Sequence, residues 1–252
     1  MPDLTVSAIY NEIDPYAAAW LENLIAAGHI EPGTVDRRSI EDLTPDDLKG
    51  KNQAHFFAGI GLWSYALRLA GWPANEPVWT GSCPCQPFSA AGKRKGKEDD
   101  RHLWPVWFRL IRESRPTTVF GEQVANRDWV DQVANDFESL GYSFGAAVLC
   151  ASAFGAPRRR RLFFVAYTDR EGKRNVAQHA KMAGLSTACK MVKSEWCEVR
   201  RMGALGDRSS SRMGRMRAIG NAIVPRVAAA FIRSALQAIT EDRLDSSHAP
   251  CR

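Results

Sequence analysis

Residues 54–61, AHFFAGIG, pass from an apolar run into a pair of glycines, and a helix-like segment follows at residues 62–70. Gly71 and Pro73 end that segment. Glycine at a strand-to-helix turn lets the backbone approach a ligand closely, and the first turn of the following helix offers unpaired amides. Such a turn can also serve packing alone. Its position after a strand and before a helix nevertheless predicts a cofactor-binding turn in an α/β fold.

Strand-like and helix-like runs of sequence surround this stretch. Strand-like runs occur at residues 4–10, 34–40, 76–81, 117–120, 142–150 and 161–167. Helix-like runs occur at residues 16–27, 102–113, 126–140 and 226–239. Their alternation predicts an α/β domain in which helices cover both faces of a sheet.

A cysteine follows one of these strands in the stretch GSCPCQPFS, residues 81–89. Pro84 restricts the backbone just before Cys85, and Pro87 prevents a helix just after it. A thiol held at a strand end is a candidate nucleophile, although most cysteines are buried and inert. The pair Cys83 and Cys85 could also be half of a metal site. No second pair has zinc spacing and the five histidines do not cluster, so we expect no metal.

Two glutamates also come directly after expected strands. Nucleotide-binding sheets place a carboxylate at such a position to accept the ribose hydroxyls, which makes Glu12 a candidate ligand. The alternative for Glu12 is a polar strand end, with Asp14 capping a helix that starts at Pro15. Glu122, considered alone, is a helix-capping acid.

Basic side chains concentrate in three places. Residues 90–101 combine lysines with glycines, which predicts a mobile loop near Cys85 that contacts phosphates. Residues 158–161 are consecutive arginines, either a solvated turn or a site for phosphate and a base. Residues 169–217 are polar and basic without a convincing periodic element, either a disordered insert or a groove-contacting region.

Composition limits the class of protein. The chain has 252 residues, a formal charge of +6 and a pI near 9.1, which fits one sizeable domain and a polyanionic partner. It has no apolar run of about 18 residues and no cleavable leader, so we expect neither a membrane protein nor a secreted one. Six irregularly spaced cysteines indicate reduced thiols and a cytoplasmic location.

Several of these stretches resemble motifs of the cytosine-5 DNA methyltransferases. Pro84-Cys85-Gln86 is similar to motif IV, whose cysteine attacks C6 of the target cytosine, and this match selects Cys85 rather than Cys83. Phe57-Ala58-Gly59-Ile60-Gly61 is similar to motif I, which holds S-adenosylmethionine, although Leu62 stands where the family more often has glycine. The segment around Glu12 and Ile13 resembles motif II, and residues 35–43 resemble motif III.

The order of these motifs differs from that of most family members. The segments similar to motifs II and III follow motif I in the family, whereas here they precede it. A permuted order is physically tolerable because sheet contacts depend on spatial order and a surface connection can reroute the chain. The residue for the adenine amino group stays open between Ser39 and Asp36.

The remaining motifs lie in the second half of the chain. Glu122 begins a segment similar to motif VI, Glu-Asn-Val, with Gln123 in place of asparagine. The arginine run resembles motif VIII, and counting back from Leu162 selects Arg159 and Arg161. Residues 217–225 resemble motif X, in which Asn221 would complete the cofactor pocket.

The resemblance implies a Rossmann-like methyltransferase sheet and a DNA (cytosine-5-)-methyltransferase that flips its base, as in restriction–modification systems. Cys85 would add to C6 while Glu122, Arg159 and Arg161 support the charge shift on the ring. Duplex DNA would be the partner of a monomeric enzyme encoded by a prokaryote or a phage. The residues expected to bind S-adenosylmethionine are Phe57, Ala58, Gly59, Ile60, Gly61, Glu12, Ile13, Leu103 and Asn221.

Four regions are expected on this basis: a catalytic and cofactor-binding domain at 1–168, a short target-recognition region at 169–216, a returning helix at 217–240 and a flexible tail at 241–252. Three other functions stay open. They are methylation of tRNA cytosine, transfer of a modified group from a methionine-derived donor, and DNA binding without catalysis.

Overall fold

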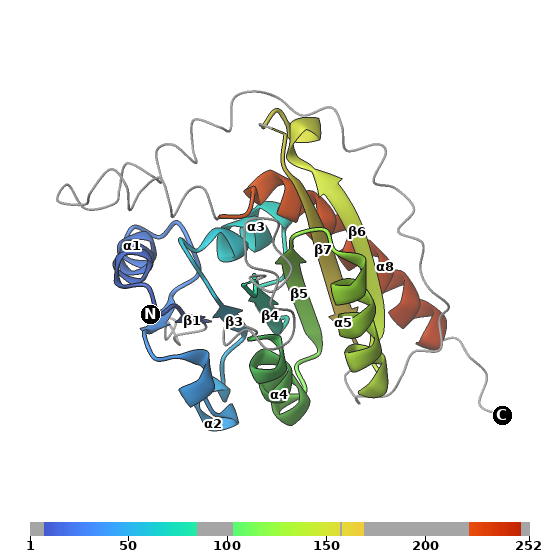
Figure 1. Ribbon diagram of the computed structural model, residues 1–252, viewed down its shortest axis with the longest axis horizontal. Coiled ribbons are helices and arrows are strands. Elements are labelled where there is room, and N and C mark those ends of the chain that lie inside the picture. Colours follow the sequence, from blue (N-terminus) through green and yellow to red (C-terminus); the bar gives the residue numbers. More distant parts are fainter. Residues whose placement is uncertain (1–7, 85–102, 157, 169–221, 248–252) are drawn as a thin grey trace.

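The computed structural model describes residues 8–84, 103–156, 158–168 and 222–247. Its centre is a seven-stranded sheet in the order β2-β1-β3-β4-β5-β7-β6 (Figure 1). The strands are β1 Ala8–Asn11, β2 Gly33–Asp36, β3 Gln53–Phe56, β4 Val78–Gly81, β5 Thr118–Gln123, β6 Ser143–Cys150 and β7 Arg160–Tyr167. The first five run parallel, and β7 is antiparallel to both of its neighbours, β5 and β6.

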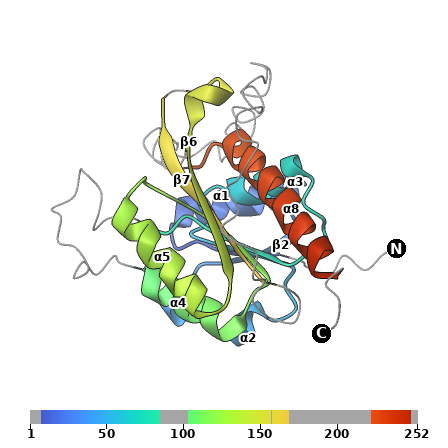
Figure 2. The same ribbon diagram turned by 90° about the vertical axis from the view of Figure 1, so that its right-hand side faces the viewer.

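Helices cover both faces of the sheet, as the alternation predicted (Figure 2). One face carries α1 Pro15–Ala26, α3 Leu62–Ala70 and α8 Pro225–Ser247. The other face carries α2 Pro45–Leu48, α4 Trp104–Ser114 and α5 Arg127–Ser139. Two short 3-10 helices, η1 Ile40–Asp42 and η3 Ala151–Phe154, complete the described elements.

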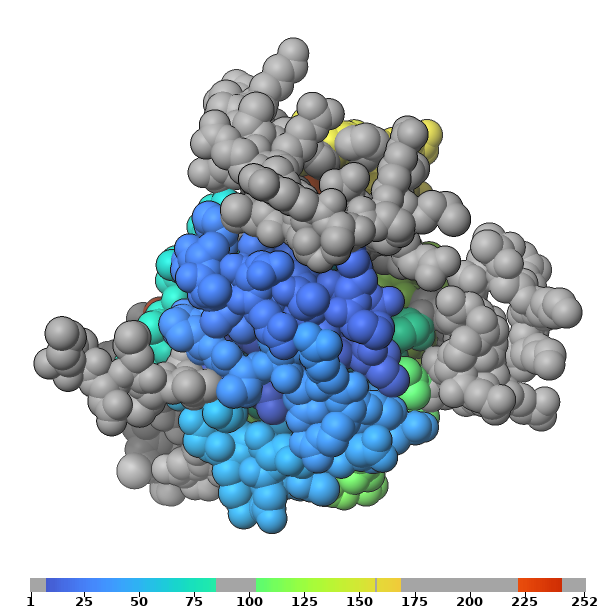
Figure 3. All heavy atoms as spheres, turned by 90° about the vertical axis from the view of Figure 1, so that its left-hand side faces the viewer, coloured from blue at the N-terminus to red at the C-terminus, as the bar shows by residue number. Residues whose placement is uncertain are grey.

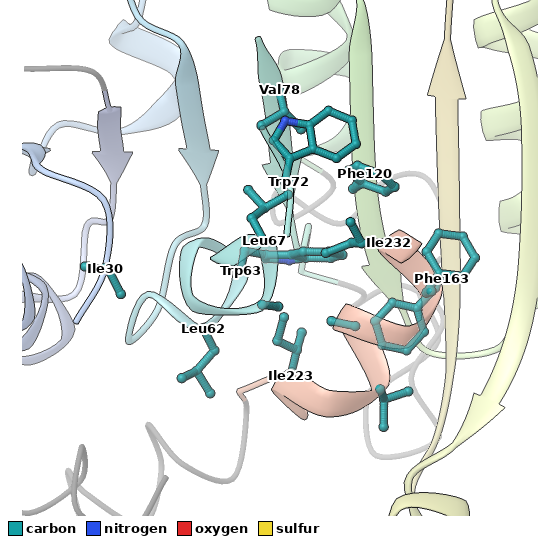
Figure 4. Close-up of a cluster of buried hydrophobic side chains, with 14 of the residues drawn as sticks. Ile30, Leu62, Trp63, Leu67, Trp72, Val78, Phe120, Phe163, Ile223 and Ile232 are labelled. Carbon is teal, nitrogen blue, oxygen red and sulfur yellow. The ribbon is translucent and has the colours of Figure 1, made fainter. Parts of the chain in front are cut away.

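The two faces have separate aromatic-rich cores. On the α8 side, Trp63 of α3 packs between the sheet residues Phe120 and Phe163 and the helix α8 (Figure 4). On the other side, Trp104 and Trp107 of α4 are fully buried among the aromatic side chains of α5 and β7. Both tryptophans of α4 therefore belong to the core.

Two glycines bring the aromatic layer close to the strand ends. Gly81 of β4 pairs with Gly121 of β5. A Cβ atom at Gly81 would lie 2.6 Å from the Trp107 ring, and one at Gly121 would lie 2.0 Å from the Phe164 ring. Because both positions lack a side chain, these rings pack directly under the end of β4, which leads to Cys85, and under the part of β5 that carries Glu122.

Two expected element boundaries need correction. The strand expected at residues 34–40 ends at Asp36, because the Ser39 hydroxyl accepts a hydrogen bond from the Glu41 amide and caps η1. The final helix, expected at 226–239 with a flexible tail from 241, continues to Ser247. Residues 240–247 contain no glycine or proline that would end a helix.

The β2 edge of the sheet is covered by the first part of the chain. Figure 3 views the molecule from this side, where α1 and the segment from β2 to α2 form most of the described surface.

Among the described residues, no helix combines the length and the apolar composition that a membrane crossing requires.

Candidate active site

The glycine turn after β3 has the backbone that its sequence predicted. Gly59 and Gly61 have φ values of 56° and 76°, and Gly61 is the N-cap residue of α3. Phe57 also has a positive φ, 51°, which is unusual for a side chain of this size and costs about 1–3 kcal/mol. The turn is held open in a strained conformation, as occurs where a backbone must face a ligand.

Glu12 closes this turn from β1. Its carboxylate accepts hydrogen bonds from the Gly59 amide at 2.7 Å and from the Asp14 amide at 2.8 Å. Burial raises the pKa of Glu12, against the lowering effect of these amides. Asp14 caps α1 by accepting from the Ala17 amide at 2.9 Å, as the alternative interpretation predicted. Glu12 and Asp14 thus have separate structural roles.

A cavity of about 390 Å³ lies beside the turn, within the size range of small-molecule sites. Ile13 lines it with 66% of its surface exposed, and among the described residues Val148 is the other exposed large apolar side chain. The predicted cofactor residues that line the cavity are Glu12, Ile13, Phe57, Ala58, Gly59, Ile60 and Leu103. Gly61, the N-cap residue of α3, does not line the cavity itself. Asn221 lies outside the described residues.

The far wall of the cavity is the loop after β2. Ser39 and Ile40 line it, whereas the Asp36 carboxylate is paired with the Arg38 guanidinium at 2.6 Å. The buried Asn11 amide holds this loop by donating to the Arg38 carbonyl at 2.9 Å. Of the two positions left open for the adenine contact, the structure places Ser39 at the cavity.

Glu122 and two arginines meet on the other side of β4. The Arg161 Nε atom lies 2.9 Å from Glu122 Oε1, and the Glu122 side chain is only 7% exposed. Arg159 joins both in lining a second, much smaller cavity with Leu149 and Ile223. Arg161 of β7 and Arg159, one residue before β7, thus both lie beside Glu122.

Burial raises the pKa of Glu122, while the nearby charges of Arg161 and Arg159 and a hydrogen bond with Ser82 lower it. Burial also lowers the pKa of Arg159, and the neighbouring charge of Arg161 acts in the same direction. A buried carboxyl between guanidinium groups suits proton donation or charge-assisted hydrogen bonding to a bound ring.

The loop that leads to Cys85 leaves β4 directly beside Glu122. Cys83 is buried, and its carbonyl accepts a 2.8 Å hydrogen bond from the Gln123 side chain. Pro84, the last described residue of the loop, lines the larger cavity. Cys85 itself lies outside the described residues, as do the basic loop at 90–101 and the recognition region at 169–216. Within the described parts of the chain, no group of three potential metal ligands occurs.

Three side chains at the site were not predicted from the sequence. Trp63, on the first turn of α3, lines the larger cavity and donates its indole N–H to the Ser82 hydroxyl at 3.0 Å. Gln123 anchors Cys83. Gln123 directly follows Glu122 and Ser82 lies three residues before Cys85, which was the available signal, but their partners depend on the pairing of β4 with β5.

The geometry of these strand ends can be compared with known proteins. Residues 72–195 match the family model of the C-5 cytosine-specific DNA methylases. The matched segment, which is just under half of the chain, belongs to this family. Among curated methyltransferases, the chain is 39% identical over 94 residues to the Type II methyltransferase M.HhaI of Haemophilus parahaemolyticus. It is 35% identical over 100 residues to the Type II methyltransferase M.AplI of Arthrospira platensis.

These matches cover 34% and 37% of the chain and 29% of each relative. The chain thus spans under a third of the length of these curated relatives. The methyltransferase EhMeth of Entamoeba histolytica has the same fold, with a TM-score of 0.55 and 12% identity over 92% of this chain and 90% of that chain. The expected Rossmann-like methyltransferase sheet with helices on both faces is confirmed.

Proposed function

We propose that this protein is a DNA (cytosine-5-)-methyltransferase that transfers a methyl group from S-adenosylmethionine to C5 of a flipped cytosine. The observation that carries this proposal is the parallel pairing of β4 and β5. Gly81 pairs with Gly121, so the loop to Cys85 and the carboxyl of Glu122 leave adjacent strands at the same edge. A nucleophile and an acid that act on the same cytosine ring must lie close together, as groups at neighbouring strand ends do.

The larger cavity fits the nucleoside part of S-adenosylmethionine. The Glu12 carboxylate can accept the ribose hydroxyls, Ile13 offers an apolar surface to the base, and the strained turn presents its backbone. Ser39 and Asn221 would complete the site. When bound, S-adenosylmethionine supplies the electrophilic methyl group that the product carries at C5.

The protein's own groups would act on the cytosine in sequence. The Cys85 thiolate forms a bond to C6, and the displaced electron pair moves toward N3, where Glu122 donates a proton or a hydrogen bond. Arg161 and Arg159 hold the Glu122 carboxyl and contact the base. After C5 has been methylated, loss of the C5 proton and breakage of the bond between Cys85 and C6 restore the aromatic ring.

We also propose that the motif order is permuted. The glycine turn follows β3, which lies between β1 and β4 at the centre of the parallel strands. The segments resembling motifs II and III follow β1 and β2, which lie outside β3 in the sheet although they precede it in the chain. The spatial site is therefore compatible with the changed chain order.

The test is incubation of the purified protein with tritiated S-adenosylmethionine and either mixed-sequence duplex DNA or tRNA. Tritium in the cytosine of DNA, absent with Cys85→Ser, is the expected result. Label in tRNA alone would overturn DNA as the substrate while keeping the chemistry. No label in either would favour another donor or a binding role.

A further inference from the structure

Ser82 and Glu122 occupy equivalent positions next to the last residue pair of β4 and β5, with Ser82 just after β4 and Glu122 within β5. They directly follow Gly81 and Gly121, which are paired in the parallel β4–β5 register. The missing side chains of these glycines point toward Trp107 and Phe164, on the α4 side of the sheet. Because successive residues of a strand point to opposite faces, Ser82 and Glu122 both point toward α3 and α8.

The Ser82 hydroxyl has a defined direction. Trp63 Nε1 lies 3.0 Å from Ser82 Oγ, and an indole N–H can only donate. The Ser82 oxygen therefore accepts this bond, and its own proton is left to donate elsewhere. When the Glu122 carboxyl is ionised it can only accept, which makes it the matching partner for that proton.

Ser82 also lies between the two cavities of the site. Ser82 and Trp63 line the larger cavity, proposed for the methyl donor. Glu122 lines the smaller cavity with Arg159 and Arg161. A hydrogen bond from Ser82 to Glu122 would extend the Trp63–Ser82 bond and connect the wall of one cavity to the acid of the other.

We propose that Ser82 is a positioning residue, whose hydroxyl, oriented by the Trp63 indole, holds the Glu122 carboxyl from the cofactor side. Arg161 holds the same carboxyl from β7. Ser82 does not touch the reacting atoms. The effect of Ser82 on catalysis rests on the proposed function, because Ser82 acts through Glu122. The effect of Ser82 on the pKa of Glu122 is independent of the proposed function.

The sign of that effect follows from the groups that face Glu122. Arg161 and Arg159 contribute positive charge from the β7 side, and Ile223, Val224 and Val227 near the start of α8 contribute only apolar atoms to the small cavity. Ser82 supplies a neutral donor from β4. Since the donated hydrogen bond favours the ionised carboxyl, removing it raises the pKa of Glu122.

The direct test is a carbon-13 NMR titration of protein labelled at the glutamate carboxyl carbons, with Glu122→Gln identifying the Glu122 signal. Ser82→Ala should move the Glu122 titration upward by about 1 pH unit, as loss of a hydrogen bond to an ionised group predicts. Trp63→Phe should cause a smaller upward shift, which disappears when Ser82 is already alanine. Ser234→Ala on α8, whose hydroxyl donates to the Ala230 carbonyl of its own helix, is the control and should cause none.

An unchanged Glu122 titration in Ser82→Ala, or independent shifts from the Trp63 and Ser82 variants, would overturn the proposal. The NMR readout needs no turnover, so an inactive wild type would contradict the proposed function and leave this inference intact. In an active enzyme, the alkaline limb of the kcat profile should shift upward in Ser82→Ala by the same amount as the Glu122 signal. A kcat profile of unchanged shape would show that Ser82 does not position Glu122 for catalysis.

Discussion

At the scale of single residues, the account depends on Glu122 as the acid. Glu122→Gln keeps the size of the side chain but cannot donate the proton, so kcat should fall about 10²- to 10⁴-fold, the usual contribution of general acid catalysis. Single-turnover kinetics on duplex DNA measure this loss. The exposed Glu138→Gln on α5 is the matched control. Equal activity of the two variants would contradict the assignment.

Gln123 stabilises the loop that leads from β4 to Cys85. Its amide donates to the Cys83 carbonyl at 2.8 Å in a buried setting, and Gln123→Leu removes this donor. The free energy of unfolding should fall by about 1–3 kcal/mol. Urea denaturation measures it, with the exposed Gln237→Leu as control. Gln123→Asn, with the residue more common in the family, should retain part of the stability only if the loop moves toward it.

At the scale of secondary-structure elements, the packing beneath β4 and β5 decides where the site lies. Gly121→Ala would place a Cβ atom 2.0 Å from the Phe164 ring. Overpacking of this kind costs about 1–3 kcal/mol, and thermal unfolding should show a lower Tm. Gly145→Ala on β6 is the control, because its nearest neighbour would be 3.7 Å away. A similar Tm for both variants would contradict this packing.

The elements could largely be predicted from the sequence because each has a local signal. Gly59, Gly61 and Gly71 mark the limits of the turn and of α3, and the structure confirms them. The end of β2 was predicted too late, because the Ser39 cap competes with strand propensity. No local signal gives the sheet order, since pairing of β3 with β1 and β4 depends on contacts between distant segments.

The same distinction applies to the site. Glu12 and Glu122 could be identified because carboxylates at strand ends have a recognisable position. The positioning roles of Trp63, Ser82 and Gln123 could not, because each needs a partner on another element. Counting back from Leu162 selected Arg159 and Arg161 within the arginine run, and in the structure both line the smaller cavity with Glu122.

At the scale of the whole molecule, buried titratable groups set the response to acid. His55 is fully buried between Thr80 Oγ1 at 2.7 Å and Gln53 Oε1 at 3.1 Å, and burial lowers its pKa to about 3. The unfolded chain binds this proton below about pH 6.5 and the folded protein does not. Stability should therefore fall by up to about 1.4 kcal/mol for each pH unit from about 6.5 toward 3.

Glu12 and Glu122 act in the opposite direction. Burial raises their pKa, so the folded protein keeps their protons longer, and their contribution to stability is present at low pH and lost as the pH rises. Comparison with His55→Gln isolates the histidine. Urea denaturation as a function of pH should show a steeper acid loss in the wild type than in the variant. Parallel curves would contradict a neutral buried His55.

The most direct test of the central claim is covalent trapping on a duplex that contains 5-fluorocytosine. Because fluorine at C5 cannot leave as a proton does, the enzyme should remain bonded to C6 after methyl transfer. We expect an S-adenosylmethionine-dependent complex whose mass spectrum places the base on Cys85, and no complex with Cys85→Ser or Glu122→Gln. A base attached to Cys83 or Cys150, or methylation of normal DNA without any trapped complex, would contradict the proposed mechanism.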